Sequence, residues 1–503
     1  MNILFYNWVK FDDPEKRGGG VTLYQKNVIL ELIRQGHKVS FFTSGIEYNP
    51  LKKGVYVRKY KSSIAPECKC YSIVNSPILA PAHLMFDKVK APLSDTSLDK
   101  VVDEIIRSAG NPDIIHLNNF EGLSLSALKL KTRHPDIKVI FGLHNYFPFC
   151  PQVNLWQKES KHCENNQEGK LCVNCVQNIP SKDNVIIAHQ IAYLMSLIGI
   201  KPHTRLFRAA YHRFNKAKLL IKAISKILGT SRLIDEVAPT PTDRLGVLFN
   251  SDGKPYQQFI NAYKDLMINQ VDRVLAVSNR TRDIAIGKGI PAKQVFTSYI
   301  GTKFAQTQMP PKVTGSDTLT VGFIGYARRD KGFFFLLDAL EATPNTLASK
   351  VHVVFACHTN DGVTLKRIKA LNSKFHAVTL YDGYNHNTLD AILENVEVGI
   401  VPPLWEDNLP QVALELHAHG CAVLASNKGG AHELSSSDLF TFEAGRADDF
   451  NYKLAKIVNR KRSAISDYFA KSKPLVTNES HCLELLEHYK QVMNSNSQLN
   501  KVA

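Results

Sequence analysis

Three carboxylates lie close together in the stretch LWEDNLPQVALELHAHG, residues 404–420. Glu406 and Asp407 precede Pro410, and Glu415 follows in an apolar pattern of helical spacing. Proline is tolerated in the first turn of a helix, so we expect a helix that begins near Pro410 and carries Glu415. An ionised carboxylate accepts two hydroxyl hydrogen bonds at once, which suits the hydroxyls of a sugar.

A second loop, GYARRDKG, offers positive charge after another apolar run. Lys331 in this loop can neutralise phosphate, and the amides of a helix N-terminus add further donors. Carboxylates for hydroxyls, with cations and amides for phosphate, describe a nucleotide-sugar site. Acids on an exposed surface and a solvated loop lysine are the alternative interpretation of the same residues.

Apolar runs of strand length alternate with helical patterns through most of the 503 residues. The first series is NILFYNW, HKVSFFTSG, DIIHLNN, KVIFGLHN and DRVLAVS; the second is TLTVGFIG, KVHVVFAC, AVTLYDG, VEVGIVP and CAVLASN. This alternation is typical of parallel sheets with helices on both faces. We therefore predict an α/β fold with two tandem Rossmann-like, doubly wound domains facing a cleft.

A polar stretch with two prolines and a glycine, residues 303–317, divides the two series and is interpreted as a linker. We expect a first domain over residues 1–305 and a second over residues 318–475. A last helix, within residues 476–503, is expected to pack back on the first domain. Ligands of such sheets bind outside the carboxyl ends of the strands, so the cleft between the domains is the predicted site.

The segment 184–234 departs from this rhythm because it contains no Asp or Glu. Its first half is apolar, and its second half places Lys and Arg opposite an apolar stripe at helical spacing. This pattern predicts a basic helical insertion in the first domain. The insertion can dock on an anionic membrane, or it can be a helical pair packed on the first domain. Its apolar half is too interrupted for a transmembrane helix.

The formal net charge of +16 favours an acidic partner, which can be a phosphate-bearing ligand, an anionic membrane or nucleic acid. No nucleic-acid-binding motif supports the last of these. The N-terminus has neither the basic region nor the long apolar core of a secretion signal, and the nine cysteines are scattered. We expect a cytoplasmic protein, with peripheral association with the cytoplasmic membrane face left open.

Four cysteines form a local cluster, the last two as C-x-x-C: Cys150, Cys163, Cys172 and Cys175. Four thiolates can hold a structural zinc, which is one prediction for this cluster. The spacing of the first three is not that of a standard zinc module. Buried thiols without a ligand and redox chemistry therefore stay as alternatives.

The C-terminal half resembles the family-4 group of retaining glycosyltransferases, which have the GT-B fold. The family signature is an acid, seven residues and Glu, followed by a small-residue helix and a glycine pair with Glu. Asp407 and Glu415 take the first two places, although the family usually has Glu at the first. The signature continues through Gly420, Val423, Ser426, Gly429, Gly430 and Glu433.

The resemblance extends over most of the chain. The glycines at 18–20 match the glycine loop that follows the first strand of the family, and FGLHNYFPFCP matches its strand-end histidine motif at His144. The loop GYARRDKG matches the pattern G-R-l-x-x-x-K-G, except that Tyr326 stands where the family has Arg. Arg328 or Arg329 is a candidate replacement.

The resemblance implies roles for individual residues. Lys331 would neutralise the donor diphosphate, Asp407 would approach the donor sugar, and Glu415 would hold the ribose hydroxyls. His144 would contact the donor sugar near the reacting carbon, and Gly19 and Gly20 would let the backbone approach the diphosphate or the acceptor. The expected donor-binding set is completed by Arg328, Asn408 and Leu409.

The expected activity is the retaining transfer of a sugar from a nucleoside-diphosphate sugar to a saccharide or lipid-linked acceptor. Family habit suggests cell-surface polysaccharide biosynthesis. The sequence has no Asp-x-Asp metal motif, so a reaction without a metal ion or other catalytic cofactor is expected. A nucleotide-sugar epimerase on the same fold and a catalytically inactive sugar-binding scaffold are the alternatives.

Overall fold

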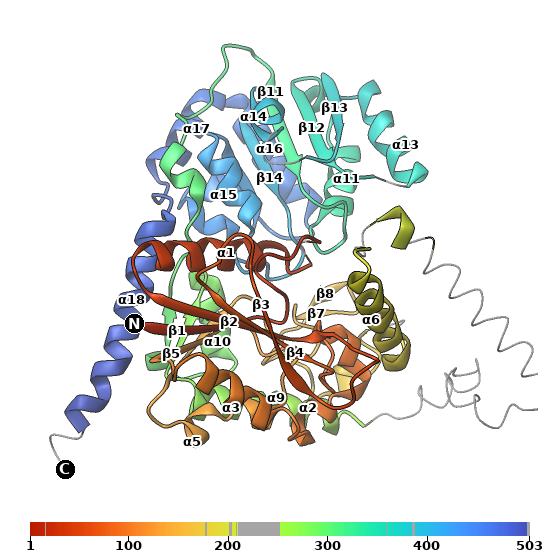
Figure 1. Cartoon of the computed structure of the whole chain (residues 1–503). Coiled ribbons are helices and arrows are strands. Elements are labelled where there is room, and N and C mark those ends of the chain that lie inside the picture. Colours follow the sequence, from red (N-terminus) through yellow and green to blue (C-terminus); the bar gives the residue numbers. More distant parts are fainter. Residues whose placement is uncertain are drawn as a thin grey trace, which may run out of the picture. The chain divides into compact units, whose positions relative to one another are not determined.

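The computed structural model describes residues 1–499 except 16, 177–178, 201–203, 208, 210–251, 360 and 385–387. The chain forms two compact α/β units (Figure 1). The first unit comprises residues 1–153, 164–274 and those from 492 onward; the second comprises residues 154–163 and 275–491. The predicted pair of Rossmann-like units is confirmed, and each unit is described by itself.

The first sheet has eight strands in the order β10-β9-β6-β5-β1-β2-β4-β3. Their bounds are β1 Asn2–Tyr6, β2 Lys38–Glu47, β3 Tyr56–Tyr60, β4 Lys69–Val74, β5 Ile114–Leu117, β6 Lys138–Leu143, β9 Arg273–Ala276 and β10 Val295–Thr297. The pairings of β1 with β2 and β5 and of β5 with β6 are parallel, as predicted. β4, which is not among the predicted strands, also pairs parallel to β2. β3 runs antiparallel to β4 at the sheet edge, where the polar sequence YVRKY gives no apolar run to predict a strand from.

The helices of the first unit that the structure describes include α1 Gly19–Arg34, α2 Ala91–Ser94, α3 Asp99–Ser108, α4 Leu125–Leu128, α5 Leu130–Arg133, α6 Lys182–Leu197 and α9 Lys254–Gln270, with 3-10 turns η1 Ala82–Lys88 and η2 Lys170–Cys172. α6 lies within the predicted basic insertion. Most of the remainder of that insertion lies outside the described residues, so its basic helix stays a prediction.

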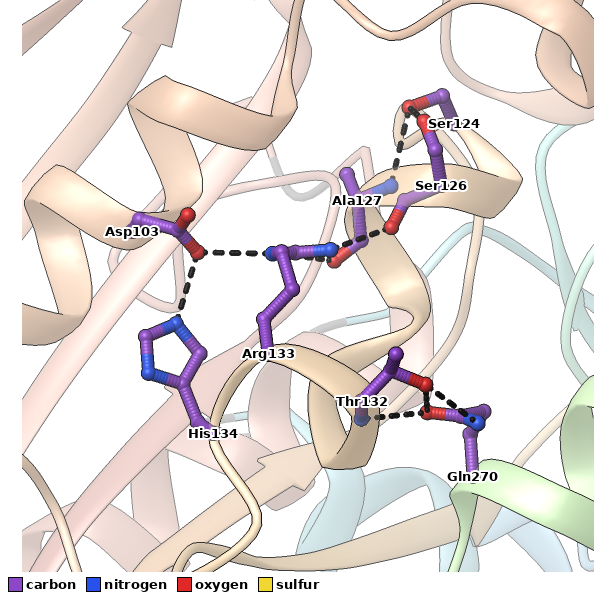
Figure 2. A network of polar contacts seen from close by, with 8 residues as sticks. All are labelled: Asp103, Ser124, Ser126, Ala127, Thr132, Arg133, His134 and Gln270. Carbon is purple, nitrogen blue, oxygen red and sulfur yellow. Dashed lines mark hydrogen bonds and ion pairs between the residues drawn. The ribbon is translucent and has the colours of Figure 1, made fainter.

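Residues 125–133 form two short helices, α4 and α5, instead of one continuous helix. Arg133 ends α5 and donates to the carbonyls of Ser126 and Ala127 at 2.5 and 2.9 Å (Figure 2). The same guanidinium donates to Asp103 of α3 at 3.0 Å, and His134 lies 2.8 Å from that carboxylate. These bonds take up carbonyls at the end of α4 and tie both helices to α3.

The second sheet is parallel and has six strands in the order β13-β12-β11-β14-β15-β16. The strands are β11 Leu319–Ile324, β12 Val351–Cys357, β13 Ala377–Asp382, β14 Val398–Val401, β15 Ala422–Ser426 and β16 Thr441–Phe442. Chain order reverses between β11 and β14, which makes this neighbouring pair the topological switch point. In doubly wound sheets, ligands bind outside the carboxyl ends of the strands at that point.

The second unit also contains the short hairpin β7 Trp156–Gln157 and β8 Lys161–His162. Its helices are α10 Asn279–Gly287, α11 Phe333–Glu341, α12 Asn345–Ala348, α13 Gly362–Ala370, α14 Leu389–Leu393, α15 Gln411–Ala418, α16 Ala447–Asn459 and α17 Lys461–Ala470, and α18 spans Asn478–Leu499. Among the described helices, none is long and apolar enough to cross a membrane.

The stretch 303–317, predicted as a linker, runs along the second unit. The backbone N–H groups of Met309 and Lys312 donate to the carbonyls of Ala418 and Gly420 at 2.7 and 2.8 Å. Thr314 N–H donates to the buried carboxylate of Glu397 at 2.7 Å. The stretch begins with the 3-10 turn η5 Lys303–Thr307, and the prolines and polar residues after it mark an irregular segment that is held by hydrogen bonds.

Candidate functional site

Two loops meet at the switch point of the second sheet. The loop after β11 carries Lys331 and the loop after β14 carries Asp407. Lys331 Nζ lies 2.6 Å from Asp407 Oδ2 and 5.4 Å from the centre of the Trp405 ring. The lysine side chain is 30% exposed and the aspartate side chain 12%, so the pair is accessible from solvent. The structure thus brings together two residues that the sequence predicts for one site.

Glycines allow these loops to pack at backbone distance. Gly332 has φ +72°, and a Cβ there would lie 1.6 Å from the carbonyl oxygen of Pro402. Gly429 has φ +71°, and a Cβ there would lie 1.8 Å from the carbonyl oxygen of Asp407. Gly430 N–H donates to that same oxygen at 3.0 Å. Only glycine tolerates such contacts at positive φ, which explains the glycine pair of the signature.

Glu406 and Asp407 are neighbours in sequence but have different environments. The Glu406 carboxylate is fully buried and accepts two hydrogen bonds from the Arg280 guanidinium, at 2.6 and 2.9 Å. Gly429 N–H donates to it at 2.9 Å, and Lys428 Nζ lies 3.4 Å away. Burial opposes ionisation, but the bonds from Arg280 and Gly429 and the charges of Arg280 and Lys428 lower the pKa of Glu406 to about 2. Glu406 therefore acts as an ionised structural anchor for the loop.

Glu433, the last acid of the signature, anchors a helix. Its carboxylate accepts from the backbone N–H groups of Asn279 and Arg280, at 2.9 and 2.6 Å, and from the Tyr299 hydroxyl at 2.6 Å. These are the first N–H groups of α10, where a negative charge is favoured. Glu433 thereby fixes the helix that carries Arg280, a residue that the sequence pattern did not single out.

Glu415 lies on α15, which begins at Gln411 with Pro410 as its N-cap. Only 6% of Glu415 is exposed, and burial raises its pKa to about 7, against the opposing charge of Lys303. Near neutral pH this carboxylate is therefore poised between its protonated and ionised forms.

Asn408 and Leu409 connect the Asp407 loop to α15, and both are buried. The carbonyl of Asn408 accepts from the Ser278 hydroxyl at 2.7 Å, which fixes the backbone at this point. Leu409 lines a small cavity of about 50 Å³, together with Leu414, Gly430, Tyr299 and Lys473.

Arg328 and Tyr326 lie in the loop that also carries Lys331. Arg328 forms two hydrogen bonds with Asp330, both of 2.8 Å, and its side chain is 62% exposed. Tyr326, which occupies the family's arginine position, is 64% exposed. The guanidinium of Arg328 is thus held within its own loop.

The glycine loop of the first unit leads directly into α1. The helix begins at Gly19, which has φ +55°, and both Gly19 and Gly20 are exposed. A Cβ on Gly18 would lie 2.1 Å from Thr22 Oγ1. The first turn of α1 carries no acidic residue, so its N-terminal amides form an exposed, electropositive helix end.

His144 follows β6 in the first unit and is half-buried. Its Nε2 lies 3.0 Å from Asn118 Oδ1, and its ring centre lies 4.6 Å from that of Tyr24 on α1. Gly142 makes room for this arrangement, because a Cβ there would lie 3.0 Å from His144 Nε2. The histidine is therefore oriented by an amide and an aromatic ring.

Buried amides surround the carboxyl ends of β1 and β5. Asn119 Nδ2 donates to Asn7 Oδ1, and Asn7 Nδ2 donates to Gln25 Oε1 at 2.9 Å. Within the described residues, Asn118 Nδ2 and Asn119 Oδ1 are buried without a hydrogen-bond partner. Buried amides need partners, so these atoms favour a polar ligand or water at the strand ends.

Glu121 is a further buried acid of the first unit that the sequence analysis missed. Its carboxylate accepts from Asn145 Nδ2 at 2.8 Å and from Ala82 N–H at 2.5 Å. Burial raises the pKa of Glu121 to about 7, against the effect of these bonds. The signal available in the sequence was an acid shortly after a strand, in HLNNFEG.

The predicted structural zinc is not supported. Cys163 belongs to the second unit, whereas Cys150, Cys172 and Cys175 belong to the first. Across the described part of the chain, no group of three or more His, Cys, Asp or Glu side chains is arranged to hold a metal ion. Cys172 and Cys175 pack instead with Phe86 in an apolar cluster.

Comparison with protein families gives two matches in different parts of the chain. Residues 305–472 match the family model "Glycosyl transferases group 1", and residues 18–168 match "Glycosyltransferase Family 4". The first match includes Lys331, Asp407 and Glu415, and the second includes Gly19, Gly20 and His144. No curated protein sequence matches the chain.

Solved structures with similar folds span nearly the whole chain. Sucrose-phosphate synthase from Thermosynechococcus elongatus has a TM-score of 0.56 at 15% identity, over 98% of this chain and 99% of its own. The catalytic domain of Arabidopsis thaliana starch synthase IV, bound to ADP and acarbose, has a TM-score of 0.54 at 12% identity, over 98% and 99%. Anabaena HepE in complex with UDP and glucose has a TM-score of 0.51 at 13% identity, over 97% and 99%.

Proposed function

We propose that this chain transfers a sugar from a nucleoside-diphosphate sugar to a saccharide or lipid-linked acceptor, with retention of the anomeric configuration, because residues 18–168 and 305–472 match the models of two glycosyltransferase families. The observation that carries this proposal is the Lys331–Asp407 pair at the switch point of the second sheet. A cation for the diphosphate and a carboxylate for the sugar hydroxyls stand side by side where such sheets bind ligands.

Lys331 is proposed to stabilise the leaving nucleoside diphosphate. Negative charge develops on that group as its bond to the sugar breaks, and a preorganised cation at this position lowers the barrier. With this charge supplied by Lys331 and by helix amides, we propose that transfer needs no metal ion. Arg328 would add positive charge if its bonds to Asp330 open.

The remaining roles follow the family resemblance. Asp407 would bind hydroxyls of the donor sugar, and Glu415 would accept hydrogen bonds from the ribose. The backbone at Asn408 and Leu409 would line the donor next to α15. In the first unit, His144 would contact the donor sugar near the reacting carbon, and Gly19 and Gly20 would present amides to the diphosphate or the acceptor.

The solved structures support a nucleotide donor without specifying its base. Anabaena HepE was crystallised with UDP and glucose, and the Arabidopsis starch synthase with ADP and acarbose. We propose cell-surface polysaccharide assembly as the setting, in a cytoplasmic enzyme.

A thermal-shift panel of UDP-, GDP-, ADP- and dTDP-sugars, with and without EDTA, tests the donor site. A ligand at 100 times its Kd stabilises the folded state by about 2.7 kcal/mol. We expect a shift with one nucleotide class, retained in EDTA and lost in Glu415→Ala. Glu394→Ala, which removes an exposed glutamate after α14, is the matched control and should keep the shift.

The reaction itself is tested by incubating the stabilising donor with candidate acceptors and recording NMR spectra of the product. Retention of the anomeric configuration is expected. An isomerised nucleotide sugar formed without acceptor would instead identify an epimerase. Absence of any nucleotide shift would favour an inactive scaffold.

A further inference from the structure

Helix α6 is apolar yet contributes no buried residue to its unit. One side of it packs inward: Val185 and Ile186 contact the cluster of Tyr48, Leu79 and Met85. His189 stacks on Tyr48 with ring centres 5.7 Å apart. These contacts hold the helix (olive in Figure 1) against the first unit.

A second apolar face lies on the other side of α6. Ile187, Ile191, Leu194 and Ile198 recur at intervals of four, three and four residues, which places them on one side of the helix, away from Val185, Ile186 and His189. Exposure rises toward the C-terminal end, with Leu194 at 40%, Leu197 at 58% and Ile198 at 73%. Leu206, shortly after, is 68% exposed. Clustered exposed aliphatic side chains mark an interaction surface.

The net charge of the sequence segment that carries this face selects among the potential partners of the face. Residues 184–234 contain nine Lys and Arg and no Asp or Glu, and Arg205, next to Leu206, is exposed. If a second copy of the chain covered this face, the two positively charged segments would repel each other. An anionic bilayer attracts it, and each cation near such a surface strengthens binding. Aliphatic side chains flanked by cations are typical of helices that lie in the membrane interface.

We propose that the outer face of α6, formed by Ile187, Ile191, Leu194 and Ile198, docks on an anionic membrane surface together with the exposed Leu197 and Leu206 beside its C-terminal end. The helix has 16 residues, too few to span a bilayer, so it would lie along the interface with this face in the acyl region. Docking depends on neither the donor nor the acceptor, so it can be tested independently of the proposed transfer reaction.

Co-sedimentation of the full-length protein with vesicles tests this face. The vesicles are phosphatidylcholine alone and phosphatidylcholine with phosphatidylglycerol, each at low and high salt. We expect binding to the anionic vesicles, weakened by salt because ions in solution screen the attraction between an anionic surface and an exposed cation such as Arg205. The double variant Leu194→Glu with Ile198→Glu should bind at least about tenfold more weakly, because two carboxylates must enter the interface.

The control is Leu51→Glu, which replaces a 75% exposed leucine in the loop between β2 and β3 and should bind as the wild type does. Equal circular dichroism spectra would show that the variants fold. Failure of the wild type to bind anionic vesicles, or equal binding by the double variant, would overturn the proposal. A dimer in light scattering that the double variant dissociates would assign the face to a second copy and also overturn it.

Discussion

Glu406 in the second unit and Glu121 in the first are both buried glutamates, and their environments shift the two pKa values in opposite directions. Arg280 and Lys428 accompany Glu406, and its pKa falls to about 2 despite burial. Among the described residues, Glu121 accepts from one side-chain amide and one backbone N–H, and burial raises its pKa to about 7. The decisive difference is the cation, since both side chains are removed from water.

The same contrast extends to the candidate ligand-binding residues. In the second unit, Lys331 and Asp407 are charged and paired. In the first unit, the strand ends carry amides and an imidazole, as at Asn118 and His144. Charged groups suit a diphosphate with its developing charge, and neutral amides suit hydroxyls. The two units therefore offer chemistry for two parts of a sugar-transfer reaction.

The largest expected effect comes from removing the charge of Glu406. Glu406→Gln leaves Arg280 and Lys428 beside a neutral buried amide, which should lower the free energy of unfolding by about 3–5 kcal/mol. Urea denaturation at pH 7 measures this, and the exposed Glu394→Gln should change little. Because the folded pKa is depressed, the stabilisation is present above pH 4.5 and is lost as pH falls toward about 2. If Glu406→Gln were as stable as the wild type, Glu406 would not anchor the loop.

Removing the cation at the switch point should act on catalysis instead. Lys331→Ala is expected to lower kcat by about 10²–10³-fold, or about 2.7–4 kcal/mol, because the leaving diphosphate loses a preorganised positive charge. Steady-state kinetics with saturating donor measures this. Lys350→Ala, an exposed lysine before β12, is the control and should leave kcat unchanged. A loss confined to KM would place Lys331 in ground-state binding only.

Glu121 offers the opposite pH dependence to Glu406. A pKa raised from 4.5 to about 7 means that its stabilising contribution is complete below pH 4.5 and is lost as pH rises through 7, by about 3 kcal/mol in total. The Glu121→Gln variant has no carboxyl group to ionise at this position. Its free energy of unfolding, measured by urea denaturation, should therefore fall less between pH 5 and pH 8 than that of the wild type. If the free energy of unfolding changed equally with pH in the variant and the wild type, Glu121 would be ionised throughout the range from pH 5 to pH 8.

Glu415 extends the comparison to ligand binding. Burial raises its pKa to about 7, and the ionised form is the one that accepts two ribose hydroxyls. Donor affinity should therefore strengthen about tenfold between pH 6 and pH 8, as the ionised fraction rises. Calorimetric titration of the donor measures this, and Glu415→Gln should bind weakly with little pH dependence. If the donor affinity of the wild type did not change between pH 6 and pH 8, Glu415 would not be the group that binds the ribose.

The sequence was sufficient to place Lys331 and Asp407 at strand ends, because each follows an apolar run. It could not decide which of Glu406 and Asp407 would pair with Arg280 and which with Lys331, since neighbours in an irregular loop have no period. That choice depends on Gly429 and on Arg280, which lies 126 residues from Glu406 in the chain. Structural zinc, one of the alternatives for the cysteine cluster, is not supported for a related reason: proximity in sequence did not place Cys163 in the same unit as the other three cysteines.

The smallest expected effect concerns a neutral hydrogen bond of the first unit. Asn118→Ala removes the partner of His144 Nε2, and such a bond contributes about 0.5–1.5 kcal/mol, so kcat/KM should fall about 2- to 13-fold. Because Asn118 would act by orienting His144, the loss should vanish when His144→Ala is already present. A double-mutant cycle in kcat/KM measures this coupling. Additive losses would show that Asn118 contacts a substrate by itself, and the first unit would then recognise hydroxyls through its amides directly.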